Sequence, residues 1–233
     1  MLSLFQAVKR FIRRHPFLYF SLVGYKPSVK RLRARRDSEL VVEAYPRSAN
    51  TTSMYSLYYS QRDLKVGHHL HVPAHVKYAV FHGIPCLVII REPLDCVASL
   101  MVMRNGGDPV SLLKDYIDFA MIVRGLMGGL ILVSFKEVVS EGMGTAIERL
   151  NLKFGKTFQK PTSSPEEKRW VEAQVRKWNR DHGGDEEKLS IPSTEKKSKA
   201  IKMKERIQIE ATGVLAVADE LYHTLIETKE QDG

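Results

Sequence analysis

Two segments of the sequence combine cationic and hydroxyl side chains in a pattern that suits an anion. The first, Tyr45–Thr52, presents the polar run Arg47, Ser48, Ala49, Asn50, Thr51 and Thr52, which contains one alanine. A guanidinium holds two oxyanion oxygens at once, and N–H and O–H groups at a helix N-terminus donate further hydrogen bonds. The triphosphate-binding pattern G-x-x-x-x-G-K-[ST] is absent, and the segment has no glycine. We predict a phosphate or sulfate site here; an ordinary helix cap by Ser48 or Thr51 would explain only one residue.

The second segment runs from Arg91 through Pro93 and Asp95 to Ser99. Proline is common in the first turn of a helix, and a carboxylate there suits the helix dipole. We therefore expect Arg91 at the end of a strand and Ser99 two turns into a helix, where both converge on one anion. The alternative is an ion pair at the helix start, without a ligand.

Five of the eight histidines lie close together in the sequence, at His68, His69, His71, His75 and His82. If residues 64–71 are extended, His69 and His71 point to one face and His68 to the other. No nearby Cys, Asp or Glu completes a tetrahedral zinc site, so we predict no metal. A general base is the better use, because histidine titrates near neutral pH. A polar residue at a strand end, or a helix-start contact, is the structural alternative.

Apolar patterning predicts the elements that position these segments. Apolar runs indicate strands at 38–45, 85–90 and 130–135. Helical periodicity is found at 73–82, 94–104, 109–126, 136–154, 165–180 and 198–228. Strands that alternate with helices are typical of a parallel sheet covered on both faces, so we predict a three-layer α/β fold. We assign residues 38–233 to one domain with a C-terminal helix, and expect Asp181–Lys204 to be a mobile or lid-like connection.

The net charge of +9 comes from one end of the 233-residue chain. Residues 1–36 hold ten of the 36 Lys and Arg residues and no acid, which leaves 26 basic against 27 acidic residues. A nucleic-acid-binding domain spreads its cations over one face of the fold, so we predict no nucleic-acid partner. The chain is instead a neutral body with a basic arm, which we assign to residues 1–37.

The arm has apolar residues at helical spacing, namely Leu4, Phe5, Val8, Phe11 and Ile12. Its apolar runs are too short to span a bilayer, and no small-residue signal cleavage site follows them. The arm is therefore either an interfacial helix on anionic lipid or a helix packed on the body with solvated cations. Cys86 and Cys96 do not suggest a disulfide framework, so we expect a reducing, cytoplasmic location, peripheral to a membrane if the arm binds lipid.

Together the two anion segments resemble a known family. The patterns Y-P-R-S-x-N-T and R-x-P-x-D-x-x-x-S are similar to those of sulfotransferases that use 3′-phosphoadenosine 5′-phosphosulfate (PAPS) as donor. The resemblance covers residues 39–155, with a weaker similarity at 135–138, and implies a P-loop-like fold. It places the 5′-phosphosulfate on Arg47, Ser48, Ala49, Asn50, Thr51 and Thr52, and the 3′-phosphate on Arg91 and Ser99. The product would be 3′-phosphoadenosine 5′-phosphate (PAP).

The resemblance also implies catalytic roles and shows two departures. A catalytic histidine of the family often stands in a His-x-Pro setting, as His71 does, so His71 is the expected base, His69 orients it or contacts substrate, and Arg47 neutralises phosphate charge. Ala49 replaces the usual glycine, and the family's C-terminal Gly-rich basic motif is absent. Four lysines of the charged segment would take the place of that motif: Lys196, Lys197, Lys199 and Lys202. The alternative is that this segment is only a solvated charged stretch.

The function expected from these residues is sulfuryl transfer to a hydroxyl of a glycan or lipid-linked acceptor. A P-loop-type kinase is one alternative, although the sequence lacks the loop lysine and a clear Mg²⁺ carboxylate. A non-catalytic membrane-surface protein on a degenerate sulfotransferase fold is the other.

Overall fold

The computed structural model describes residues 2–181 and 193–231, and its centre is a sheet of four parallel strands. The strand order is β2-β1-β3-β4, with β1 at Leu40–Ala44, β2 at Val66–His68, β3 at Cys86–Ile90 and β4 at Ile131–Ser134. Val42 of β1 lies beside His68 of β2 on one side and Leu87 of β3 on the other. The strands predicted at 38–45, 85–90 and 130–135 are confirmed.

Helices connect and cover these strands. Those before β3 are α1 (Leu2–Arg14), α2 (Pro16–Val23), α3 (Pro27–Leu32), α4 (Asn50–Ser60) and α5 (Pro73–Phe81). Those after it are α6 (Pro93–Met103), α7 (Pro109–Arg124), the 3₁₀ turn η1 (Met127–Gly129), α8 (Phe135–Ser140), α9 (Gly144–Phe154), α10 (Pro165–Asp181), α11 (Thr194–Glu210) and α12 (Thr212–Gln231). Proline stands in the first turn of α5, α6 and α7, where its missing N–H costs no helical hydrogen bond.

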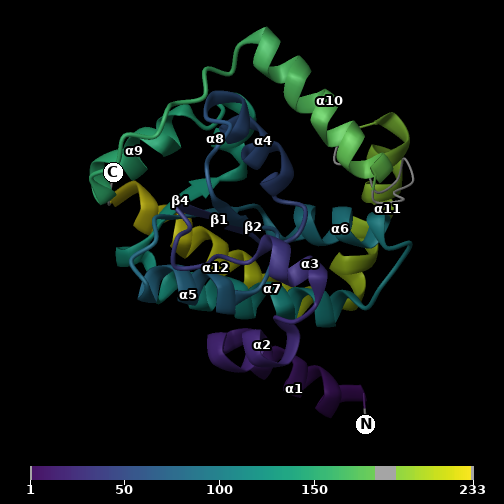
Figure 1. The fold of residues 1–233 in the computed structure, drawn as a ribbon. Coiled ribbons are helices and arrows are strands. Elements are labelled where there is room, and N and C mark those ends of the chain that lie inside the picture. The colour runs from purple at the N-terminus through teal and green to yellow at the C-terminus, as the bar shows by residue number, and fades with distance from the viewer. Residues whose placement is uncertain (1, 182–192, 232–233) are drawn as a thin grey trace.

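The sheet is buried on both faces, as the continuously apolar strands predicted. Val41 and Val88 belong to the core shared with α5, α6, α7 and α12, whereas Val42 and Leu87 belong to the core shared with α4 and α9. In Figure 1, α5, α7 and α12 lie below the sheet, and α4, α8 and α9 lie above it. The protein is therefore an α/β fold with helices on both faces of a parallel sheet.

Two predicted helices are each divided in two. The helix expected at 136–154 is α8 followed by α9, because Gly142 has φ +78° and a Cβ there would lie 1.7 Å from Ser163 Oγ. The helix expected at 198–228 is α11 followed by α12, which separate at Ala211. The single predicted C-terminal helix is thus wrong.

The stretch expected to be a mobile connection also differs from its prediction. Residues 194–204 lie in α11, which begins where the Ser193 side chain accepts a hydrogen bond from the Lys196 N–H. α11 packs along α6, and α12 packs along α7. The prediction is wrong for this part of the stretch; residues 182–192 lie outside the described residues.

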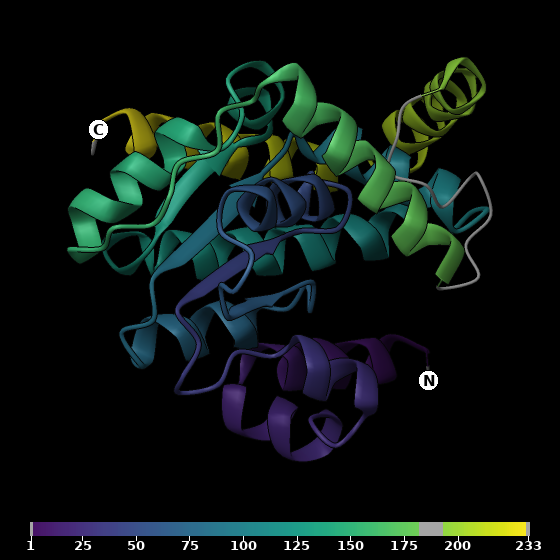
Figure 2. The ribbon, with the colours of Figure 1, turned by 45° about the horizontal axis from the view of Figure 1, so that its top comes forward.

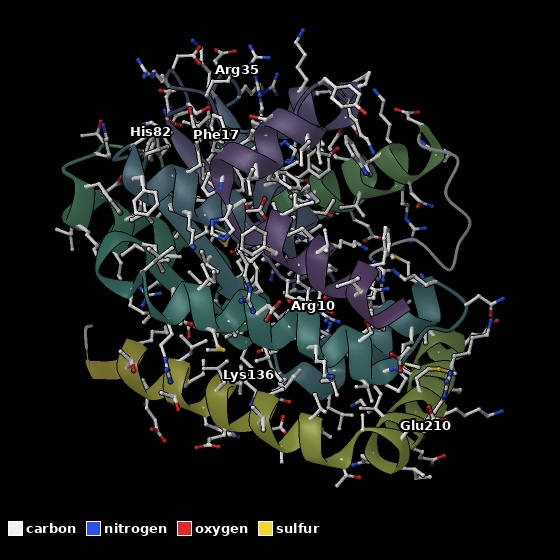
Figure 3. All side chains as sticks on the ribbon, turned by 90° about the horizontal axis from the view of Figure 1, so that it is seen from below. Arg10, Phe17, Arg35, His82, Lys136 and Glu210 are labelled. Atoms are coloured by element: carbon white, nitrogen blue, oxygen red, sulfur yellow. The ribbon has the colours of Figure 1, made fainter. Side chains whose placement is uncertain are left out.

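The basic arm forms three short helices, and α1 lies with its basic side against the body. Arg10 and Arg13 pair with Asp115 of α7 at 2.9 and 3.3 Å, and Arg14 pairs with Asp118. Figure 3 labels Arg10 where α1 approaches α7. The expectation of a packed helix with solvated cations is therefore wrong for these three arginines. Among the described helices, none is long and apolar enough to cross a membrane.

Candidate functional site

The carboxyl ends of all four strands open into one cavity of about 1090 Å³. Both anion segments contribute to its lining, as do His69, His71 and residues of α8, α10 and α11, but the fully buried Ser48 does not line it. In doubly wound sheets, ligands bind in the crevice at this edge. The structure thus brings together the residues that the sequence analysis assigned to a single site.

The first anion segment is a tight loop that leads into α4. Arg47 and Ala49 both have left-handed backbone conformations, with φ of 70° and 66°. This conformation costs a residue with a Cβ about 1–2 kcal/mol, so Ala49 stands where the backbone favours glycine. The loop directs the start of α4 at the cavity, and the positive end of a helix dipole attracts anions.

Several polar atoms of this loop are buried without a hydrogen-bond partner. Ser48 and Ser53 are fully buried and Asn50 is 4% exposed, and neither hydroxyl oxygen nor either amide atom has a partner in the structure. A buried polar group without a partner costs about 1–3 kcal/mol. Unpaired groups of this kind near a cavity leave hydrogen-bonding capacity that a polar ligand could use.

The second anion segment contacts the first directly. Arg47 Nε donates to Ser99 Oγ at 3.1 Å, and an Arg91 guanidinium N–H donates to the Arg47 carbonyl at 2.8 Å. The Arg91 guanidinium lies 4.1 Å from the centre of the Phe135 ring. The backbone carbonyl of Arg91 accepts a hydrogen bond from the Tyr116 hydroxyl. Arg91 also faces Asp95 at 3.8 Å, so the predicted helix-start ion pair is present. Arg91 and Ser99 each contact Arg47, and their convergence on one anion stays a prediction.

Two neighbouring guanidiniums give this part of the cavity its charge. Burial first, and the charge of Arg91 second, lower the pKa of Arg47. Two like charges at close range repel each other unless an anion lies between or beside them. The electrostatics therefore favour a multiply charged anion in the cavity.

His71 has one ring nitrogen fixed and one left as an acceptor. Its Nδ1 lies 2.8 Å from the Ala44 carbonyl oxygen, which only accepts, so Nδ1 carries the proton and donates. In the neutral ring Nε2 then holds the lone pair, because the two nitrogens share one proton. His71 lines the cavity, so this imidazole is arranged to accept a proton.

His69 is placed differently, since both of its ring nitrogens are engaged. Nε2 lies 2.8 Å from Thr51 Oγ1, and Nδ1 lies 2.7 Å from Nδ1 of His68. Burial first, followed by the charges of His71 and His68, holds the pKa of His69 well below 6.5. His69 is therefore a neutral ring that positions Thr51 at the start of α4.

Glu43 is a buried residue that contacts the His71 loop and that the sequence analysis missed. It is fully buried on β1, and its carboxylate accepts from His75 Nδ1 at 2.7 Å and from the N–H groups of Leu70 and His71 at 2.8 and 3.0 Å. Burial alone would raise the pKa of Glu43, but the hydrogen bonds from His75 and from the Leu70 N–H outweigh this and lower it. A Glu that follows two valines inside a predicted strand, VVEAY, was the available signal.

Helices α10 and α11 close the open side of the cavity. Trp178 of α10 stacks on His69 with ring centres 6.4 Å apart, and neither this residue nor Lys204 was singled out from the sequence. Lys196 and Lys197 line the cavity beside Lys204, which pairs with Asp95. Lys199 instead pairs with Glu195 at 3.0 Å, and Lys202 is exposed and outside the cavity lining.

Within the described ranges, no three His, Cys, Asp or Glu side chains gather into an arrangement that could hold a metal ion. Cys86 and Cys96 are free and buried, and burial raises the pKa of each thiol.

Comparison with known proteins does not assign this site. No protein-family model matches the chain, and no curated protein matches it.

Proposed function

We propose that this protein is a sulfotransferase that moves a sulfuryl group from PAPS to an acceptor hydroxyl. The observation that carries the proposal is a set of buried, unpaired polar atoms in the two anion segments and in the adjoining first turn of α4: Ser48 Oγ, both Asn50 amide atoms, Ser53 Oγ and Arg91 Nε. Three of these residues, Ser48, Asn50 and Arg91, are ones to which the resemblance to the PAPS-dependent family assigns the donor's phosphate ends. An unliganded scaffold gains nothing from leaving these groups unpaired.

The chain's own residues fit a donor with two separate anionic ends. Ser48, Asn50, Thr51 and Thr52, at the start of α4, would hold the 5′-phosphosulfate, and Arg47 lies beside them. Arg91 and Ser99 would hold the 3′-phosphate, with Lys196, Lys197 and Lys204 of α11 in place of the missing C-terminal motif. A P-loop-like fold of the sulfotransferase type is part of this proposal. The donor supplies the sulfuryl group and its phosphate leaving group.

In the proposed reaction His71 acts as the general base. Its Nε2 accepts the hydroxyl proton as the acceptor oxygen attacks, and the Ala44 carbonyl holds the resulting imidazolium in place through Nδ1. The Arg47 guanidinium neutralises charge on the phosphate oxygen that leaves. His69 acts as a positioning residue through Thr51, because neither of its ring nitrogens is available to a substrate.

The proposed acceptor is a hydroxyl on a glycan or on a lipid-linked molecule. The cavity is large enough to hold a nucleotide and part of a second molecule, and its rim carries polar side chains of α10 and α11. A cytoplasmic protein at a membrane surface would meet such acceptors.

Ligand-dependent thermal unfolding tests the donor assignment. PAP should raise the melting temperature of the wild-type chain, because a ligand that binds only the folded state stabilises it, and ATP with Mg²⁺ should not. Arg91→Ala should remove most of the PAP shift, whereas Arg124→Ala, an exposed arginine on α7, should keep it.

The other outcomes identify the alternatives. Stabilisation by ATP with Mg²⁺ and not by PAP would indicate a kinase. Stabilisation by neither ligand would indicate a non-catalytic protein on this fold.

A further inference from the structure

The arm exposes the apolar side of α1 to solvent. Its basic side is occupied by Asp115 and Asp118 of α7, so the opposite side of the helix faces outward. On that side Leu4 is 69% exposed, Phe5 67% and Phe11 55%. Large apolar side chains exposed together indicate an interaction surface.

Helix α2 packs on α1 and also exposes large apolar side chains. Phe17 is 81% exposed and Leu22 53%, and Tyr25, just after α2, is 73% exposed. Figures 1 and 2 show α1 and α2 together at the edge of the molecule, and in Figure 1 they lie below α5 and α7. We call these side chains the apolar arm face: Leu4, Phe5, Val8, Phe11, Phe17, Leu22 and Tyr25.

The surroundings of the apolar arm face are cationic. Residues 1–36 contain no acid, and the exposed cations among them are Lys9, Lys26, Lys30, Arg31, Arg35 and Arg36. Lys9 follows Phe5 by one helical turn, and Lys26 is adjacent to Tyr25. The face thus combines aromatic side chains with positive charge, which is the composition of interfacial segments that bind anionic lipid.

We propose that the apolar arm face docks on the surface of an anionic lipid bilayer. The aromatic and aliphatic side chains enter the boundary of the acyl chains, and the flanking cations contact the headgroups. A second copy of the chain is a poorer occupant, because a two-fold interface would place this acid-free segment against itself and bring like charges together. The helices lie on the bilayer and do not cross it, since α1 has 13 residues and α2 has 8.

The ion pairs of α1 make the docking rigid. Arg10, Arg13 and Arg14 fasten the helix to α7, so binding at the arm orients the whole body relative to the bilayer. Arg13 also donates to the His71 carbonyl oxygen at 2.8 Å, which ties the docking helix to the loop that carries His71. An ordinary interfacial helix uses its cations for lipid, whereas this one uses three of them for the protein.

Vesicle co-sedimentation of the full chain tests the proposal independently of any enzymatic activity. The wild-type chain should pellet with phosphatidylcholine vesicles that contain phosphatidylserine, and weakly with vesicles of phosphatidylcholine alone. Raising the salt to about 1 M should reduce binding, because the Debye length falls to about 3 Å. Phe5→Ser/Phe11→Ser should lower the partition coefficient about 100-fold, at roughly tenfold for each lost aromatic side chain.

The matched control is Leu152→Ser/Ile209→Ser, which removes two helical side chains that are each 81% exposed but lie on α9 and α11. It should pellet like the wild type, and circular dichroism should show that both variants keep their helices. Equal pelleting of the Phe5→Ser/Phe11→Ser variant, or equal wild-type binding to both vesicle types, would overturn the proposal. The proposal would also be overturned if the wild type did not bind vesicles but formed a dimer, detected by light scattering, that the Phe5→Ser/Phe11→Ser variant did not form.

Discussion

Replacing Glu43 by glutamine should destabilise the fold far more than a Glu-to-Gln change at the surface. Three N–H groups lie within 3.0 Å of an oxygen of the fully buried carboxylate, from His75 Nδ1, Leu70 and His71, and the Ala44 N–H is a longer fourth donor at 3.3 Å. A carboxylate accepts from all three at once, whereas a glutamine side chain has one acceptor oxygen and one donor amide. In either orientation the glutamine amide meets at least one N–H.

His75 cannot relieve this conflict by changing its tautomer. The Ala34 N–H donates to His75 Nε2 at 2.7 Å, so that nitrogen must be the acceptor and Nδ1 the donor. A proton moved to Nε2 would only transfer the clash to Ala34. The Ala34–His75–Glu43 chain therefore requires an acceptor-only residue at its end.

The cost follows from the hydrogen bonds that change. One buried N–H is left unpaired, at about 1–3 kcal/mol, and the other hydrogen bonds lose the extra strength of a charged acceptor. We expect Glu43→Gln to lower the free energy of unfolding by about 3 kcal/mol at pH 7. Glu92→Gln is the control, because Glu92 pairs with Lys136 at the surface and should change stability by less than about 0.5 kcal/mol.

Urea denaturation at several pH values measures this difference. The pKa of Glu43 is lowered in the folded state, so its charged form contributes stability that is present above 4.5 and lost as the pH falls through the folded-state pKa. The difference in the free energy of unfolding between wild type and Glu43→Gln should therefore become smaller as the pH drops below 4.5. A loss under about 0.5 kcal/mol at pH 7, or a gap that does not narrow in acid, would refute the reasoning.

Two further predictions concern the histidines. Asparagine tolerates the φ of 52° at position 71, so His71→Asn should preserve the backbone there. The variant should lower the rate at which PAP is formed from PAPS with glycan or glycolipid acceptors by about 10²–10⁴-fold. PAP affinity should be unchanged, and His82→Ala should have normal turnover; normal turnover in His71→Asn would exclude His71 as the base. Burial lowers the pKa of His68 to about 4, so stability should fall as the pH drops from 6.5 towards 4. The His68 ring should titrate near 4 by NMR, and a midpoint near 6.5 would contradict its buried, neutral state.

Apolar patterning was sufficient for most of the sheet but not for its edge. β1, β3 and β4 are buried on both faces and therefore read as apolar runs. β2 has three residues, two of them Gly67 and His68, and no pattern of hydrophobicity marks it. It packs so closely on the arm that a Cβ at Gly67 would lie 2.8–2.9 Å from atoms of Ala34, a contact visible only in three dimensions.

The start of helix α11, at residues 194–197, was missed for a different reason. Its sequence has few apolar residues, which suggested a mobile segment, yet Lys, Glu, Met and Ala are all strong helix formers. Pairs such as Glu195–Lys199 and Arg206–Glu210 support its exposed side, and Ile207 anchors it in the core. The orientation of α1 was likewise beyond the sequence, because nothing in the chain links Arg10 to Asp115 across a hundred residues.

The site itself depends on backbone conformations that leave no sequence signature. Arg47, Ala49, His69 and His71 have positive φ, and glycine, the usual marker, is absent from all four positions. Strain of this kind persists only where the surrounding structure holds it, and functional sites are where it gathers. Glu43 holds one such loop in place, because its carboxylate accepts hydrogen bonds from the N–H groups of Leu70 and His71. Because the same loop carries the proposed base, a buried carboxylate with no access to substrate sets the position of His71, and losing it should impair the site as well as the fold.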